Sequence, residues 1–337
     1  MKFSVIVPVY NAEKYLEDCL NSLKKQEFQD CEFIIWNDGS TDGSEGIINK
    51  YCVDTRFRVF HGQNAGSLVA RKNSLQRAQG KYVLFLDADD IVSDNLLNYI
   101  DKEIDERTDL FQYASSLSIK DLCKTSHLPS TKYNRIDFIE KYVRPVLIDG
   151  TVGVVMWNKV FLREKLLQVI GDYPTGMLED YLTVLEYSEF VYQFQTTNTI
   201  LHYYRVVEGS LSKRYNSEWF DILLYVQNRK KEYMKRMELN EKEDIQHAAA
   251  WFLRYVLNKL LKGIKYMETV DCKKILSSNE VRRQAALLER SKMDTYFERL
   301  IRRCKYDELL RIIRVEASLL NVLRKIKKVF VDIKGKR

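Results

Sequence analysis

Three carboxylates stand together where a short apolar run ends, in the stretch Gly80-Lys81-Tyr82-Val83-Leu84-Phe85-Leu86-Asp87-Ala88-Asp89-Asp90. Residues 82–86 are strand formers without polar alternation, which predicts a strand buried on both faces. In open α/β sheets, ligands bind beyond the carboxyl ends of such strands. Asp87 and Asp89 point the same way if the chain stays extended. Their oxygens suit Mg²⁺ or Mn²⁺, which in turn holds phosphate oxygens, whereas a solvated acidic turn that caps the next helix is the alternative.

Three further apolar runs end in polar loops in the same way. Residues 3–9 lead into Tyr10 and Asn11, residues 31–36 into the loop 37–44, and residues 56–60 into the loop 61–67. Helical patterns follow these loops, and this alternation predicts an α/β fold with a Rossmann-like, mostly parallel sheet whose strand ends meet at one edge. The glycine fingerprints of dinucleotide sites and of phosphate loops are missing, so strand-end carboxylates, amides and a metal would have to bind a nucleotide.

Residues 1–100 contain four motifs, namely Val7-Pro8-Val9-Tyr10-Asn11, Asn37-Asp38-Gly39-Ser40-Thr41-Asp42, Asn64-Ala65-Gly66 with Ala70-Arg71-Lys72-Asn73, and Phe85-Leu86-Asp87-Ala88-Asp89-Asp90. These motifs resemble those of family 2 glycosyltransferases with the GT-A fold, and they occur in the order and spacing of that family. The resemblance implies an inverting transferase that uses a nucleotide-activated sugar.

The resemblance also implies roles for single residues. The nucleotide sugar is expected to contact Pro8, Tyr10, Asn11, Asp38, Asn64, Arg71, Asp87 and Ala88. Asp89, with Asp87, is the expected ligand of Mn²⁺ or Mg²⁺. A carboxylate such as Asp38 accepts the imide N–H of uracil, which favours a UDP-sugar. Turn chemistry is the alternative explanation for Asp38, and an ion pair on a helix surface is the alternative for Arg71.

A second acidic centre lies at Glu179 and Asp180, directly before the apolar pattern of residues 181–185. This order predicts a helix N-terminus, where the helix dipole stabilises a carboxylate and fixes its direction. The resemblance favours Asp180 as the general base, with Glu179 as the main alternative. Simple capping of the helix is the other explanation.

Two further segments are expected near the donor. In the resembling family, a segment like 208–214 lies over the donor phosphates, where Lys213 and Arg214 would neutralise pyrophosphate and Ser212 would hydrogen-bond it. A charged linker is the alternative. Trp157 lies in a stretch that is similar to one behind the family's active site, where it would stack on a sugar or fill the core.

Composition divides the chain near residue 215. Residues 1–214 carry a net charge of −5 and residues 215–337 a net charge of +12, and proline is absent after Pro174. We therefore expect a catalytic GT-A domain over residues 1–215 and an all-α domain over residues 216–337. The apolar residues of the second half recur at helical spacing, so its helices are expected to pack on one another, with a second copy of the chain as a candidate partner.

The last segment, residues 307–337, combines basic residues with an apolar stripe that comprises Leu309, Leu310, Ile312, Ile313, Leu319, Leu320, Leu323, Ile326, Val329 and Phe330. Residues 324–337 alone carry a net charge of +6. A basic amphipathic helix predicts binding to the inner surface of the cell membrane, and a bundle helix with a solvated basic face is the alternative. Nucleic acid is not an expected partner, because stacking aromatics are missing from the basic stretch. No apolar run approaches the ~20 residues of a membrane span. The scattered cysteines favour a cytoplasmic protein, and the basic C-terminal segment favours a peripheral one at the inner face of the membrane.

Together with these patterns, the family resemblance implies a metal-dependent, inverting transfer of sugar from a UDP-sugar to a hydroxyl of a glycan. A lipid-linked oligosaccharide at the membrane is the expected acceptor, as in the synthesis of cell-surface polysaccharides. A sugar-nucleotide pyrophosphorylase is the first alternative, although it should carry a basic, glycine-rich loop after its first strand. A non-catalytic scaffold is the second, although it should have lost the Asp-x-Asp motif or the acidic pair.

Overall fold

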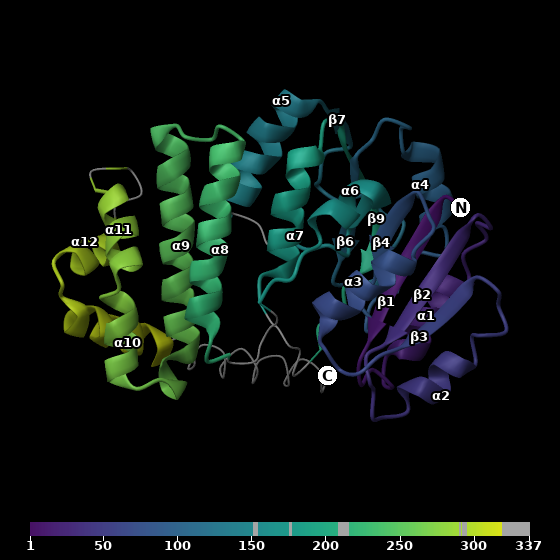
Figure 1. The fold of residues 1–337 in the computed structure, drawn as a ribbon, viewed down its shortest axis with the longest axis horizontal. Helices are drawn as coiled ribbons and strands as arrows, with labels where there is room; N and C mark the ends of the chain where they lie inside the picture. The colour runs from purple at the N-terminus through teal and green to yellow at the C-terminus, as the bar shows by residue number, and fades with distance from the viewer. Residues whose placement is uncertain (151–153, 175–176, 208–215, 290, 292–294, 319–337) are drawn as a thin grey trace, which may run out of the picture. The chain divides into compact units, whose positions relative to one another are not determined.

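The computed structural model describes residues 1–150, 154–174, 177–207, 216–289, 291 and 295–318. The chain forms two compact units. One, which we call the sheet unit, comprises Met1–Leu147 and Val152–Arg214, and the other, the helical unit, comprises Ile148–Thr151 and Tyr215–Arg337 (Figure 1). We describe each unit by itself.

The sheet unit is built on one sheet with the strand order β3-β2-β1-β4-β8-β6-β9-β5, and β7 pairs with β9. The strands are β1 (Phe3–Val9), β2 (Cys31–Asn37), β3 (Phe57–His61), β4 (Tyr82–Phe85), β5 (Ile91–Val92), β6 (Leu110–Ser116), β7 (Thr131–Tyr133), β8 (Lys159–Leu162) and β9 (Phe194–Tyr203). The four strands predicted from the first half are therefore confirmed within a residue or two.

Strands β1 to β4 are mutually parallel, as the alternation of strands and helices predicted. Strand β8 is antiparallel to both β4 and β6, and β5 and β7 are antiparallel to β9. The sheet is therefore mixed beyond β4. The sequence did not predict β5, β7 or β8, because these strands have two to four residues and lack a clear alternation.

Helices cover both faces of the parallel strands. The helices of this unit are α1 (Leu16–Lys24), α2 (Ser44–Asn49), α3 (Ser67–Arg77), α4 (Leu96–Glu103), α5 (Arg135–Phe138), α6 (Arg163–Val169) and α7 (Glu179–Tyr187), with a π-helical stretch over Ile139–Ile148. Helices α1 and α4 pack on one face of the sheet, and α3 packs on β1 and β2 from the other. This is the doubly wound arrangement.

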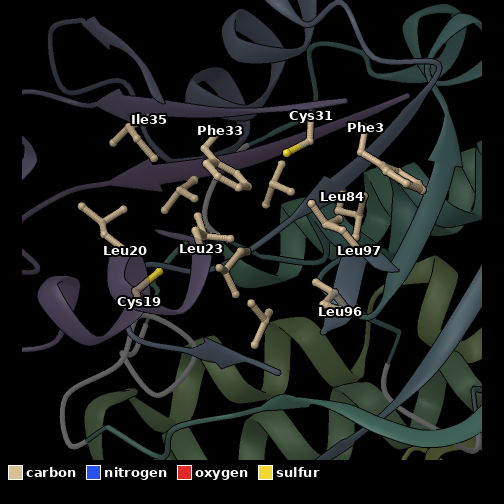
Figure 2. Packing of buried hydrophobic residues seen from close by; sticks show 14 of the residues in the cluster. Phe3, Cys19, Leu20, Leu23, Cys31, Phe33, Ile35, Leu84, Leu96 and Leu97 are labelled. Atoms are coloured by element: carbon tan, nitrogen blue, oxygen red, sulfur yellow. The ribbon is translucent and has the colours of Figure 1, made fainter. Parts of the chain in front are cut away.

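The core of the first face is shown in Figure 2. Phe3, Phe33 and Leu84 come from three adjacent strands and meet Leu20 and Leu97 of the covering helices, each at most 1% exposed. Burying a side chain of this size stabilises the fold by roughly 1.5–3 kcal/mol. The continuous apolar runs of β1, β2 and β4 are thus explained, since both faces of these strands are covered.

Gly80 lets two chain segments meet just before β4. A Cβ atom at this position would lie 2.5 Å from the backbone nitrogen of Ser4. The Gly80 amide donates to the Ser4 hydroxyl at 2.8 Å. Only glycine fits such a close backbone approach, which places the start of β4 directly beside β1.

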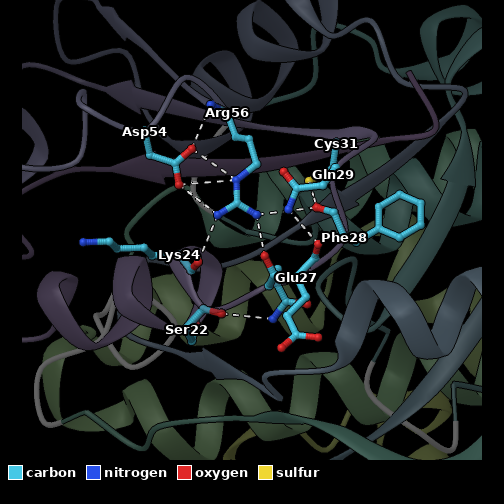
Figure 3. A network of polar contacts seen from close by, with 9 residues as sticks. Ser22, Lys24, Glu27, Phe28, Gln29, Cys31, Asp54 and Arg56 are labelled. Atoms are coloured by element: carbon cyan, nitrogen blue, oxygen red, sulfur yellow. Dashed lines mark hydrogen bonds and ion pairs between the residues drawn. The ribbon is translucent and has the colours of Figure 1, made fainter.

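Arg56 fixes the start of β3, at the end of that strand away from His61 (Figure 3). Its guanidinium pairs with Asp54 at 2.8 Å and donates to the Lys24 carbonyl at 2.9 Å. A further hydrogen bond from the Arg56 guanidinium reaches the main-chain carbonyl of Gln26. The C-terminal end of α1 and the following loop are therefore tied to β3, and the opposite strand ends are left for the polar loops.

The helical unit contains α8 (Trp219–Arg236), α9 (Lys242–Gly263), α10 (Thr269–Leu276), α11 (Asn279–Leu287) and α12 (Tyr296–Arg302), followed by helix over residues 306–318. Helix α9 packs against α8 and α11. The predicted helical character of this half is confirmed.

A four-residue segment from the middle of the chain belongs to the helical unit. The carbonyl of Ile148 accepts from the buried Lys230 ammonium, and Asp149 accepts from Arg254 at 2.8 Å. At Gly150 the backbone has φ of 67°, and a Cβ atom would lie 1.9 Å from the ring of Trp251. Glycine is required there on both counts.

Part of the predicted C-terminal amphipathic stripe is buried. Leu309, Leu310 and Ile313 are at most 2% exposed, so these residues pack inside the helical unit and do not form a membrane-binding face. The basic segment 324–337 lies outside the described residues. Among the helices that the structure describes, none has the length and hydropathy to cross a membrane.

Candidate active site

The polar loops that follow β1, β2 and β3 contact one another at the carboxyl edge of the sheet. Asn11 adopts a left-handed backbone with φ of 49°, and its side-chain oxygen accepts from the Thr41 amide at 2.8 Å. The Asn11 amide in turn donates to the Ser40 hydroxyl at 3.1 Å. The ring of Tyr10 is half-exposed at the same edge. Two predicted site residues after β1 thus lie against the loop after β2.

Asp38 is buried and shapes the turn that precedes α3. One carboxylate oxygen accepts from the Gly66 amide at 2.9 Å, and the other from the Ala65 amide at 3.2 Å. Gly66 has φ of 92°, a backbone conformation that favours glycine. Asp38 therefore binds the turn that contains Asn64, and the two residues predicted at the nucleotide are brought together.

Arg71 is the central cation of the site. It extends from α3, its side chain is 6% exposed, and it pairs with Asp87 at 2.7 Å and with Asp180 at 2.8 Å. Burial lowers the pKa of the guanidinium, but the Asp180 and Asp87 carboxylates outweigh this and raise it. Arg71 therefore links the Asp-x-Asp motif to the acidic pair of the second centre.

The acidic pair begins helix α7, as predicted. Asp180 accepts from the Met156 amide at 3.0 Å through the oxygen that does not bind Arg71. Glu179 accepts from the Ser67 hydroxyl at 3.1 Å. Both carboxylates lie in the first turn of α7, where the helix dipole stabilises their charge. Asp180 is the more exposed of the two and lies beside the motif through Arg71.

Asp89 has the electrostatics of a cation ligand. Burial raises the pKa of its carboxyl to about 6, and the nearby Asp90 and Asp87 carboxylates add to this rise. No ion pair to Asp89 is present within the described ranges, whereas Asp87 is neutralised by Arg71. A divalent cation would relieve the excess negative charge, so the donor set fits one. Three-residue clusters of metal-ligating side chains are absent from the described part of the chain, so the rest of a cation's shell would come from ligand and water.

The stretch around Trp157 contacts the acidic pair through the Met156 amide, which donates to Asp180. Lys159 is buried and donates to the Val155 carbonyl and the Asn158 side chain, both at 2.8 Å. Burial lowers the pKa of its ammonium to about 7, although Asp180 works in the opposite direction. These bonds shape the turn whose Met156 amide binds Asp180. The ring of Trp157 stacks on His202 at 4.4 Å and on Tyr204 at 5.5 Å.

The sequence did not predict several groups that contribute to the site. The Met156 amide, His202 and Arg205, whose guanidinium donates to the Asp89 carbonyl at 2.8 Å, carry no local signal, because each acts through a contact with a distant segment. Three predicted residues, Ser212, Lys213 and Arg214, lie outside the described residues.

Replacing Arg71 with methionine is expected to lower the free energy of unfolding by about 3 kcal/mol. The change leaves Asp87 and Asp180 partly buried without the cation that pairs them. Urea denaturation measures the effect. The neighbouring Lys72 pairs with the exposed Asp172, so Lys72→Met serves as control and should cost less than about 1 kcal/mol. Equal losses of unfolding free energy in the two variants would show that the ion pairs of Arg71 do not stabilise the site.

A mostly parallel sheet with carboxylates at its carboxyl edge, beside an acidic helix start, defines the class of GT-A glycosyltransferases. The family model "Glycosyl transferase family 2" matches residues 4–167. The chain is 30% identical over 232 residues to "Putative glycosyltransferase EpsH" of Bacillus subtilis, which covers 67% of each protein. The chain belongs to glycosyltransferase family 2, and the resemblance of its motifs is confirmed.

Two other relatives extend the comparison. "Glycosyltransferase GlyA" of Streptococcus pneumoniae is 29% identical over 234 residues, which span 66% of this chain but 33% of GlyA. The crystal structure of residues 1–349 of Staphylococcus aureus TarS in complex with UDP-GlcNAc superposes with a TM-score of 0.69 at 21% identity. The match covers 95% of this chain and 92% of that chain. At this identity the likeness establishes the fold.

Proposed function

We propose that this chain transfers a sugar from a UDP-sugar to a hydroxyl group of a glycan, with inversion at the anomeric carbon. The observation that carries the proposal is the bridge of Arg71 between Asp87 of the Asp-x-Asp motif and Asp180 at the start of α7. A single side chain therefore joins the donor motif to a candidate base. We assign this chemistry to residues 1–215 as the catalytic domain and residues 216–337 as a helical domain.

The donor is assigned to the carboxyl edge of β1 to β4. The loops with Pro8, Tyr10 and Asn11 and the buried Asp38 with Asn64 form the side for base and ribose, and Asp87 and Ala88 form the side for the sugar and diphosphate. Similarity of the fold to TarS, whose structure holds UDP-GlcNAc, supports UDP as the nucleotide. An N-acetylhexosamine or a hexose is the sugar class that we propose.

Asp89 is the residue that would hold Mn²⁺ or Mg²⁺, with Asp87 beside it. When bound, the cation supplies Lewis-acid stabilisation of the negative charge on the departing diphosphate. Asp89 contributes a carboxylate without an ion-pair partner among the described residues, since Arg205, the cation that lowers its pKa, pairs with Asp18. Arg71 donates to the Asp87 carboxylate at 2.7 Å, which fixes the direction of that side chain in the same turn.

Asp180 takes the proton of the acceptor hydroxyl. The acceptor oxygen forms a bond to the anomeric carbon while the bond from that carbon to the diphosphate oxygen breaks, and UDP leaves with the electron pair. Attack from the face opposite the leaving group inverts the configuration. The Arg71 guanidinium and the Met156 amide orient the two oxygens of Asp180, and Glu179 remains the alternative base.

For the acceptor, we propose a growing cell-surface glycan, lipid-linked and presented at the inner face of the membrane. The relative TarS, named a poly(ribitol-phosphate) beta-N-acetylglucosaminyltransferase, supports a polymer as the acceptor class. Peripheral membrane binding through residues 324–337 stays a prediction from their charge, as does self-association of the helical domain.

Calorimetric titration of the full chain with UDP, in the presence and absence of Mn²⁺, tests the proposal. We expect UDP to bind at least about tenfold more tightly with the metal, because the cation joins the diphosphate to Asp89. GDP and CMP serve as controls for the base. UDP binding that is the same with and without Mn²⁺ would contradict the proposal.

A panel of UDP-sugars, scored for slow hydrolysis of the donor, then identifies the sugar. A pyrophosphorylase would instead release a sugar phosphate when supplied with inorganic pyrophosphate, and this product is not expected here. A non-catalytic scaffold would bind UDP without turning over any donor in the presence of acceptor.

A further inference from the structure

The chain at the end of β9 holds the turn that carries the Asp-x-Asp motif. The guanidinium Nε of Arg205 donates to the main-chain carbonyl of Asp89 at 2.8 Å. The backbone amide of the same residue donates to the Asp90 carboxylate, also at 2.8 Å. One residue therefore binds both the main chain and the last side chain of the turn, from a position 116 residues away in the sequence.

Arg205 is itself held in place by contacts with Asp18 and Tyr15. Its second guanidinium nitrogen pairs with Asp18 on α1 at 2.8 Å, and its side chain is 21% exposed. The guanidinium carbon lies 5.0 Å from the centre of the Tyr15 ring. A fork of donors can contact a carbonyl and a carboxylate at once, which a lysine ammonium does not reproduce at the same two points.

Asp90 adds a second attachment between the turn and β9. Its free oxygen lies 3.1 Å from Nε2 of His202, and both side chains are fully buried. The two atoms are at ion-pair distance without the alignment of a hydrogen bond. The ring of Trp157 stacks on the ring of His202. The Asp90 side chain thus turns inward, away from the edge where Asp89 is partly exposed.

We infer that Arg205 is a positioning residue for Asp89, which sets the direction of that carboxylate toward a divalent cation and the diphosphate it carries. The inference rests on the proposed function, since it takes Asp89 as the cation ligand. Asp89 lies in the short turn between Asp87 and Asp90, so the direction of its carboxylate depends on the conformation of the main chain in that turn. Arg205 fixes that main chain through the Asp89 carbonyl.

Arg205→Met tests the inference in the full chain, with Asp18→Asn as the matched control. The first variant removes the donor to the Asp89 carbonyl. The second removes only the ion pair to α1 and leaves that donor present. The measurements are the dissociation constant of UDP with Mn²⁺, the same constant without metal, and the thermal melting temperature.

We expect Arg205→Met to weaken UDP binding about tenfold when Mn²⁺ is present and to leave metal-free binding within about twofold of the wild type, because one charged hydrogen bond is lost. Asp18→Asn should stay within about twofold in both conditions. If Arg205→Met does not fold, Arg205→Lys replaces it, with an expected loss of about threefold confined to the Mn²⁺ condition.

Two results would overturn the inference, and they have different meanings. A wild-type protein that binds UDP equally with and without Mn²⁺ contradicts the proposed function and this inference with it. A wild type with metal-dependent binding, together with an arginine variant that loses melting temperature but keeps that binding, contradicts the inference alone and leaves Arg205 a structural residue.

Discussion

Replacing Asp180 with asparagine is expected to lower kcat by ~10²–10⁴-fold, which is the usual contribution of a general base. Asparagine retains the shape of the side chain but cannot take the acceptor proton. Both oxygens of Asp180 accept from donors in the structure, Arg71 on one side and the Met156 amide on the other. The variant's amide nitrogen must therefore face one of these donors, and the loss of the negative charge weakens the contact to Arg71 in either orientation. Turnover at saturating donor and acceptor measures the effect.

Glu179→Gln is the matched control for this change. Glu179 lies one residue earlier in the same first turn, and its carboxylate accepts from the Ser67 hydroxyl. If Asp180 is the base, Glu179→Gln should reduce kcat less than about tenfold, through the weakened hydrogen bond alone. The dissociation constant of UDP with Mn²⁺ should change little in either variant. The reverse ranking of the two kcat values would assign the base to Glu179.

Asp89→Asn is expected to reduce kcat/KM by about 10³-fold and to abolish the stimulation of activity by Mn²⁺. An amide is a much weaker ligand for a hard cation than a carboxylate, so the diphosphate loses its attachment to the protein. A titration of activity against Mn²⁺ concentration measures this directly. The fold itself should be retained, because Asp89 makes no ion pair with the described residues and its charge is repelled by Asp90 and Asp87.

Asp87→Asn distinguishes the loss of metal binding from the loss of the ion pair with Arg71. Asp87 pairs with Arg71, so its amide variant should lower both the melting temperature and activity, whereas Asp89→Asn should lower activity alone. Activity of Asp89→Asn that still rises with Mn²⁺ as in the wild type would show that another group holds the cation.

The sequence predicted the parallel half of the sheet and the loops that carry the site. Strands β1, β2 and β4 are covered on both faces, so each is a continuous apolar run that is visible without neighbours. Parallel strands joined by helices must end at the same edge, and this topology gathers the loops with Asn11, Asp38 and Asp87. The helix start at Glu179 could also be predicted from neighbouring residues alone, since acidic residues directly precede an apolar pattern.

Only the tertiary structure decided how these parts contact each other. Arg71 was expected beside the nucleotide, and its pairing with Asp180, 109 residues away, follows from the position of α7 against α3. The bonds from Arg205 to Asp89 and from Met156 to Asp180 likewise join distant segments. Strand β8 is short and antiparallel, and Ile148 and Asp149 accept hydrogen bonds from Lys230 and Arg254 of the helical unit; neither stretch has a periodic pattern. Local patterning records which face of an element is buried, whereas the partner of a polar side chain depends on which element packs beside it.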